Sequence, residues 1–120
     1  MRTGIDIIKI SRIKLSEAFI SKVATDKEIE YLNTYKSESA KKESLAGLWA
    51  VKEAIFKLLG LGKDSKVAFK NIEISHDQSG RPFASLNGVA FETFLKLNLS
   101  EIDVSISHED DYAVAIAVAK

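Results

Sequence analysis

One segment near the middle of the chain constrains the fold more than any other. Between positions 45 and 56 every residue except Lys52 and Glu53 is apolar or glycine. Apolar residues at helical spacing predict a helix, and a helix that is apolar on almost every side is buried on most sides. We therefore expect the rest of the chain to pack around this helix.

Capping residues, turn residues and apolar periodicity predict the other elements. The expected elements are a strand over 4–10, a helix from Ser11 toward Val23, a helix opened by a Thr25 and Glu28 capping box and running to about Tyr35, the long helix from Ser37 or Ser39 to Gly60, strands over 67–75 and 83–86 joined by a turn at 77–82, a short helix over 88–97, and a hairpin of strands 102–108 and 112–118 with its turn at 109–111. The first strand is apolar on both faces, which favours a central position. Because helices gather early and strands late, the expected class is α+β, an antiparallel sheet with packed helices.

Length, composition and charge exclude several classes of protein. The 120 residues are expected to form a single domain over 1–120, and the absence of cysteine excludes disulfides and cysteine zinc sites. The formal net charge of +0 provides no bulk positive field for nonspecific nucleic-acid binding. The apolar run 112–119 is too short to cross a membrane, and residues 1–13 lack the apolar core of a signal peptide. We expect a cytoplasmic protein with neither nucleic acid nor membrane as partner.

Charged residues occur where the pattern requires apolar ones. Lys52 falls inside the apolar sector of the long helix, Glu53 lies at its edge, and Lys57 follows one turn later. A lone buried charge is costly, so we expect Lys52 and Glu53 to be paired, metal-bound or turned into a polar cleft. The alternative is an ordinary surface pair between Glu53 and Lys57, with Lys52 extending outward.

Asp6 is a second misplaced charge. It shares a strand face with Ile8 and Ile10, so a carboxylate is embedded in core sequence. Alone, it could simply accept hydrogen bonds from backbone amides. Together with Glu53 it offers two hard oxygen donors, which is the protein share of a typical Mg²⁺ site.

Two histidines complete the set of candidates. His108 continues the apolar row of its strand just before the acidic turn 109–111. It is either a structural residue satisfied by a neighbour or a proton acceptor or phosphate donor at the rim of a site. His76 lies beside a predicted turn and is interpreted as a surface residue. The acidic turn is interpreted as a solvated loop, with Glu109 as an alternative further ligand.

Three segments in this order and spacing resemble a known family. They are Gly4-Ile5-Asp6, Trp49-Ala50-Val51-Lys52-Glu53-Ala54 and Ser105-Ile106-Ser107-His108. The set resembles the holo-acyl-carrier-protein synthases, the short-chain 4′-phosphopantetheinyl transferases, and the resemblance covers essentially the whole chain.

The resemblance implies an activity and an assembly. The family transfers the 4′-phosphopantetheine group from coenzyme A to a serine of apo acyl carrier protein, a step of fatty acid biosynthesis and lipid metabolism, and releases adenosine 3′,5′-bisphosphate. It implies Mg²⁺ held by Asp6 and Glu53. It also implies the single-copy version of the transferase fold, a homotrimer with sites at subunit interfaces. The alanine face of 112–119 and the apolar long helix are compatible with such burial.

The resemblance assigns a role to each candidate. Glu53 is expected to orient or deprotonate the incoming serine, and Lys57 to contact the phosphates. Lys52 is expected to support the motif through a salt bridge. Ser107 and His108 are expected to line the nucleotide side, with His108 as a further catalytic candidate.

The sequence departs from the family pattern at two places. Leu48 stands where many members have arginine, so Lys41 and Lys42 are the candidates for binding the 3′-phosphate, although lysines on a helix are commonly just solvated. The segment 60–63 is close to the family's glycine-rich turn, but Leu61 replaces a common threonine.

The resemblance also implies docking of an acidic carrier protein near the N-terminus. Arg12 occupies the matching motif position, and Lys14 and Lys22 extend the basic surface. Charges at the rim of an interface mainly set the encounter rate and its salt sensitivity. The alternative is an ordinary solvated face.

Two other functions use the same residues. One is a different Mg²⁺-dependent phosphoryl or nucleotide hydrolase, which would consume coenzyme A or nucleotides without a carrier protein. The other is a noncatalytic carrier-protein or nucleotide-binding module, although a binder has no need for two costly carboxylates.

Overall fold

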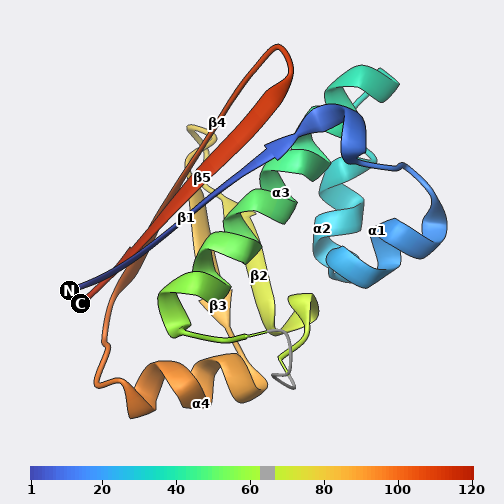
Figure 1. Ribbon diagram of the computed structural model, residues 1–120. Helices are drawn as coiled ribbons and strands as arrows, with labels where there is room; N and C mark the ends of the chain where they lie inside the picture. Colours follow the sequence, from blue (N-terminus) through green and yellow to red (C-terminus); the bar gives the residue numbers. More distant parts are fainter. Residues whose placement is uncertain (63–66) are drawn as a thin grey trace.

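The computed structural model describes residues 1–62 and 67–120. In chain order the elements are β1 (Arg2–Lys9), a 3₁₀ turn (Ile10–Arg12), α1 (Glu17–Val23), α2 (Asp26–Leu32), α3 (Glu38–Leu59), a second 3₁₀ turn (Phe69–Asn71), β2 (Ile72–His76), β3 (Pro82–Leu86), α4 (Gly88–Lys96), β4 (Ile102–Glu109) and β5 (Tyr112–Ala119). Two antiparallel sheets form, one with the order β1-β5-β4 and one with β2 beside β3 (Figure 1). The α+β class is confirmed, with two sheets in place of the single sheet expected.

The long helix α3 is the centre of the core, as its sequence predicts. The Ser37 hydroxyl accepts a hydrogen bond from the Ala40 amide at 3.0 Å, and Gly60 ends the helix with a φ of 71°. Figure 1 shows α3 against the three-stranded sheet, with α1 and α2 on one side of the molecule and α4 at one end. Each charged candidate on α3 is thereby fixed relative to the strands.

Small residues let α3 lie very close to the sheet. A Cβ placed on Gly4 of β1 would collide with the carbonyl oxygen of Ala54 on α3. The alternate alanines of β5 are buried beneath the same helix. The alanine face therefore packs inside the subunit, and the opposite face of the sheet is the open one.

The open face explains one prediction that was wrong. β1 pairs only with β5, so it is an edge strand and not a central one. Ile5 and Ile7 are 60% and 64% exposed, and Ile116 of β5 is exposed beside them. Apolar residues on both faces predicted a strand covered on both sides, but among the described residues α3 covers one face and the other stays open.

Several element boundaries also differ from the expected ones. The first helix begins at Glu17 behind a Ser16 cap, because residues 10–12 turn as a 3₁₀ helix. The second helix ends at Leu32, earlier than expected, although its capping box is confirmed. β2 begins only at Ile72, and the turn between β4 and β5 is the two residues 110 and 111.

Within the described ranges, no helix combines the length and the apolar character that crossing a bilayer would require. Lys63, at the end of the glycine-rich segment 60–63, lies outside the described residues.

Candidate active site

Two carboxylates converge where β1 crosses α3. Asp6 lies on the inner face of β1, and Glu53 lies on the adjacent surface of α3. The Lys57 ammonium is 3.0 Å from Asp6 Oδ1 and donates a second hydrogen bond, also 3.0 Å, to the Ile5 carbonyl. Burial, and then the neighbouring Asp6 charge, raise the pKa of Glu53, while Lys57 opposes the shift. The site therefore holds negative charge that Lys57 compensates only in part.

This arrangement fits a divalent cation of the magnesium type. Asp6 and Glu53 supply hard oxygen donors, and the raised pKa of Glu53 reflects a carboxylate that a further positive charge would favour. In residues 1–62 and 67–120 no group of three or more acidic, histidine or cysteine side chains is placed to hold an ion. The remaining ligands of an ion held by Asp6 and Glu53 would thus be water and substrate oxygens, as magnesium commonly has.

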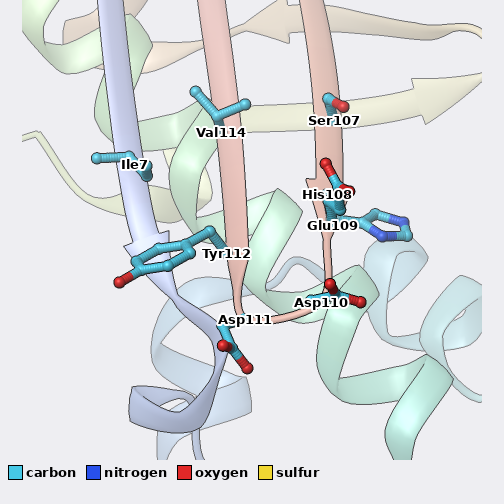
Figure 2. Close-up of a pocket in the computed structure, with 8 residues that line it drawn as sticks. All are labelled: Ile7, Ser107, His108, Glu109, Asp110, Asp111, Tyr112 and Val114. Atoms are coloured by element: carbon cyan, nitrogen blue, oxygen red, sulfur yellow. The ribbon is translucent and has the colours of Figure 1, made fainter.

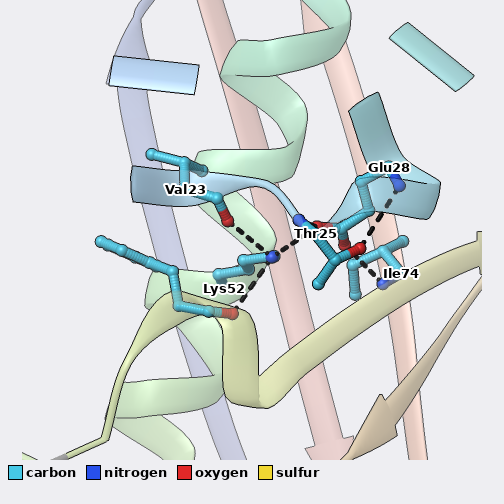
Figure 3. A network of polar contacts seen from close by, with 6 residues as sticks. Val23, Thr25, Glu28, Lys52 and Ile74 are labelled. Carbon is cyan, nitrogen blue, oxygen red and sulfur yellow. Dashed lines mark hydrogen bonds and ion pairs between the residues drawn. The ribbon is translucent and has the colours of Figure 1, made fainter. Parts of the chain in front are cut away.

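Lys52, the residue before Glu53, is fully buried and fully paired (Figure 3). Its ammonium lies 2.6 Å from Glu28 Oε1 and donates to the carbonyls of Val23 at 2.7 Å and Phe69 at 3.1 Å. Burial lowers the pKa of Lys52, and the Glu28 charge opposes that shift. The expectation that Lys52 is paired is confirmed.

Glu28 is the buried partner that the sequence analysis did not pair with Lys52. Its Oε2 accepts from the Ile74 amide at 2.7 Å, and its Oε1 accepts from the Thr25 amide at 2.8 Å (Figure 3). The capping box identified Glu28 as a residue of the first helical turn. Nothing in the local sequence indicated that it pairs with Lys52, which lies 24 positions further along the chain. The network holds α1, α2 and β2 onto α3 next to Glu53.

His108 lies one strand further across the sheet than the carboxylate pair, beyond β5. It sits near the end of β4, and its Nδ1 is 3.5 Å from Glu43 Oε2 on α3. In the sheet, β5 separates β4 from β1, which carries Asp6. On α3, Glu43, which contacts His108, and Glu53 face directions about 80° apart at 100° per residue. One chain therefore presents the carboxylate half and the His108 half on different flanks.

Two cavities adjoin His108. One, of about 440 Å³, opens on the outer face of the sheet near the hairpin turn and is lined by Ile7, Ser107 and Tyr112 together with the acidic residues 109–111 (Figure 2). Ser107 follows the outward row of its strand, opposite Val114. The structure thus brings Ser107 and His108 to one cavity wall, although they lie on alternate faces of β4.

The second cavity, of about 200 Å³, lies between α3, β4 and the turn that joins β2 to β3. His76 and Tyr31 stack at its wall with ring centroids 4.3 Å apart and 8° between the ring planes. His76 is half-buried and not the surface residue expected, and this burial lowers its pKa. Tyr31 and Glu43 are lining residues that sequence reasoning missed, since neither belongs to a recognisable motif.

The basic candidates lie away from this second cavity. Lys41 donates to Asn33 Oδ1 at 3.0 Å and lines a groove between α1 and α2. Lys42 shares another groove with Lys14. Arg12 and Lys22 are exposed, the first in the 3₁₀ turn and the second at the end of α1.

Comparisons with known proteins agree on one family. The model of the 4′-phosphopantetheinyl transferase superfamily matches residues 2–117. A holo-acyl-carrier-protein synthase of Ruminiclostridium cellulolyticum is 42% identical over 123 residues, covering 98% of this chain and 90% of that protein. The Helicobacter pylori synthase in complex with coenzyme A superposes with a TM-score of 0.82 at 29% identity, covering 98% of this chain and 99% of that one. The Bacillus anthracis synthase in complex with CoA (3′,5′-ADP) superposes with a TM-score of 0.81 at 32% identity. The match covers 98% of this chain and 94% of that one.

Proposed function

The chain belongs to the 4′-phosphopantetheinyl transferase superfamily and is similar throughout to holo-acyl-carrier-protein synthases, and we propose that it uses Mg²⁺ at Asp6 and Glu53 to move the phosphopantetheine arm of coenzyme A onto a carrier protein. The observation that carries this proposal is the convergence of two carboxylates beside one lysine at a single crossing of β1 and α3. Coenzyme A is the ligand of the Helicobacter pylori relative, which supports the choice of donor.

The transfer makes one bond and breaks one bond. The serine oxygen of the carrier protein attacks the phosphorus that bears the pantetheine arm, and the bond from that phosphorus to the bridging oxygen breaks. Adenosine 3′,5′-bisphosphate leaves with the bridging oxygen. The bound Mg²⁺ would neutralise charge on the diphosphate during this exchange.

The chain's own side chains orient the reactants. Glu53, whose pKa is raised by burial and by Asp6, is suited to hold the serine hydroxyl or to take its proton. Lys57 is exposed, so its ammonium can turn from Asp6 toward substrate phosphate oxygens. His108 and Ser107, on the strand beyond β5, are suited to line the nucleotide side.

We propose that the active site is completed by a second subunit in a homotrimer. The carboxylate half and the His108 half lie on different flanks of one chain, so one coenzyme A would contact both halves where two chains meet. The open sheet face with exposed Ile5, Ile7 and Ile116 offers apolar surface for such contact. On this account residues 1–120 are one domain that works only as an assembly.

The carrier protein is proposed to dock on the basic segment that follows β1. Arg12 and Lys14 are exposed there, Lys22 lies at the end of α1, and Lys42 shares a groove with Lys14. An acidic carrier would be attracted to this surface. Lys41 and Lys42 stay candidates for the 3′-phosphate only if a neighbouring subunit brings the nucleotide to them. We place the reaction in the cytoplasm, within fatty acid biosynthesis and lipid metabolism.

The deciding experiment measures the mass of the carrier protein. The chain is incubated with coenzyme A, Mg²⁺ and apo carrier protein, and the carrier is analysed by mass spectrometry while the nucleotide products are separated. A carrier heavier by one phosphopantetheine arm, with adenosine 3′,5′-bisphosphate released in equal amount, supports the proposal. Loss of coenzyme A without a heavier carrier indicates a hydrolase, and no change in either reactant indicates a binding module.

A further inference from the structure

The Lys57 ammonium occupies the carboxylate pair to which we assign the cation. It lies 3.0 Å from Asp6 Oδ1 and donates a second hydrogen bond, also 3.0 Å, to the Ile5 carbonyl. Lys57 follows Glu53 by one helical turn on α3. Burial and then Asp6 raise the pKa of Glu53, and the Lys57 charge opposes both. One ammonium thus compensates two carboxylates.

A divalent cation of the magnesium type would take the same place. It prefers the same carboxylate oxygens and supplies the same compensation with twice the charge. An ammonium within hydrogen-bond distance of Asp6 would repel that cation at short range and would hold an oxygen that the cation needs. Lys57 and a divalent cation therefore compete for Asp6.

Lys57 can leave Asp6, whereas the other lysine of the motif is fixed. The Lys57 side chain is 54% exposed, and exposed ion pairs add little to stability. Lys52 lies on the same helix, but it is 0% exposed and is held by Glu28 and by two backbone carbonyls. The helix α3 thus carries one lysine that holds the fold and one that can exchange partners.

We propose that Lys57 is an internal competitor of the divalent cation, pairing with Asp6 until a cation binds and then donating to the diphosphate of the donor. The proposal rests on the metal assignment made above and deepens it, because it couples metal binding to donor binding through one side chain. Since such coupling is reciprocal, a donor that holds Lys57 also removes the competitor of the cation and tightens cation binding.

Equilibrium binding of Mn²⁺ to the chain without coenzyme A tests the competition. Mn²⁺ accepts the same carboxylate ligands as Mg²⁺, and the unbound ion is quantified by electron paramagnetic resonance. Lys57→Met removes the ammonium from a side chain of similar length, so the Kd for Mn²⁺ should fall by about three- to tenfold. Lys9→Met is the matched control, because it removes the same charge from the exposed outer face of β1, and it should change the Kd by less than about twofold. An equal fall in both variants would show a general effect of charge and would overturn the proposal.

Nuclear magnetic resonance shows whether the ammonium leaves Asp6. In a chain that contains isotope-labelled lysine, the Hε protons of Lys57 give separate signals while Asp6 and Ile5 hold the ammonium, and one averaged signal when the side chain rotates freely. The signals, assigned by their loss in Lys57→Met, should merge as Mg²⁺ is added and separate again when coenzyme A follows. Separate signals that persist at saturating Mg²⁺, or a single signal from the start, overturn the proposal.

Asp6→Asn separates a failure of this proposal from a failure of the proposed function. The variant should bind Mn²⁺ at least about tenfold more weakly, since it replaces a charged hard donor by a neutral amide. If Mn²⁺ binding does not depend on Asp6, the metal assignment itself fails. If binding depends on Asp6 but Lys57→Met leaves the Kd unchanged, the metal assignment stands and the competition is overturned.

Discussion

Lys52 and Glu28 form an ion pair, 2.6 Å long, whose two side chains are 0% and 2% exposed. The pair joins the helix that carries Glu53 to the start of α2, and its remaining hydrogen bonds reach α1 and β2. Removing one member of a buried pair leaves the other charge without compensation, which commonly costs about 3–5 kcal/mol.

We therefore expect Lys52→Met to lower the free energy of unfolding by about 3–5 kcal/mol, measured by urea denaturation. Lys52→Met combined with Glu28→Gln should recover part of that loss, because the buried negative charge is removed and the single amide oxygen can still accept one of the two backbone hydrogen bonds, from Thr25 or from Ile74. If the double variant is no more stable than the single one, the loss does not come from an uncompensated Glu28 charge.

Because β1 lies very close to α3, we expect that Gly4 cannot be replaced without loss of stability. Gly4→Ala would drive a methyl group into the Ala54 carbonyl, so we expect a loss of about 3 kcal/mol or more in unfolding free energy. Gly62→Ala is the matched control, because a Cβ there has no atom within 4 Å. Equal stability of the two variants in urea would show that β1 does not lie so close to α3.

The Lys52–Glu28 pair and the packing of β1 on α3 also show which features could be predicted from the sequence. Local signals predicted the Thr25 capping box, the Ser37 cap and the Gly60 end of α3, because each depends on neighbours within one turn. The partner of Lys52 depends on how three elements pack, and the open face of β1 depends on its place at the edge of the sheet. The apolar pattern predicted burial at both places but could not show which element, if any, covers them.

The same limit applies to the candidate site. Asp6 and Glu53 were recognisable because charges in core sequence are conspicuous, and the structure brings their elements together. Tyr31, His76 and Glu43 gather at one cavity only through the packing of α2, α3 and β2. None of the three breaks the local pattern, so the cavity could not be read from the sequence.

His76 predicts how stability depends on pH. Burial lowers its pKa, with Asp77 and Glu28 opposing, so the folded protein favours the neutral ring. As the pH falls, His76 in the unfolded chain is protonated near the ordinary histidine pKa of about 6.5, whereas His76 in the folded protein is protonated only at lower pH. The folded state is therefore destabilised as the pH falls through about 6.5. His76→Phe keeps a ring against Tyr31 and cannot titrate, so the decrease in unfolding free energy between pH 7 and pH 5 should be smaller than in the unaltered chain. An unchanged or larger decrease would contradict a buried neutral His76.

The carboxylate pair predicts a loss of activity without a loss of fold. Asp6→Asn and Glu53→Gln each remove one hard donor, so we expect at least about a 100-fold lower transfer rate at limiting Mg²⁺. Their melting temperatures without metal should be equal to or higher than that of the unaltered chain, since burial and then the Asp6 charge raise the pKa of Glu53, and each change removes the repulsion between the two carboxylates. Full transfer activity in either variant would remove the metal assignment.

The separation of the two half-sites predicts complementation between subunits. Glu53→Gln and His108→Ala each inactivate every site when all chains carry the same change. A trimer that contains both variants, isolated through two different affinity tags, pairs one intact carboxylate half with one intact His108 half at one of its interfaces, so about a third of full activity should return. Trimers mixing Glu53→Gln with Asp6→Asn are the matched control, because both changes lie in the same half and no interface is repaired. Equal residual activity in the two mixtures would place the whole site within one chain.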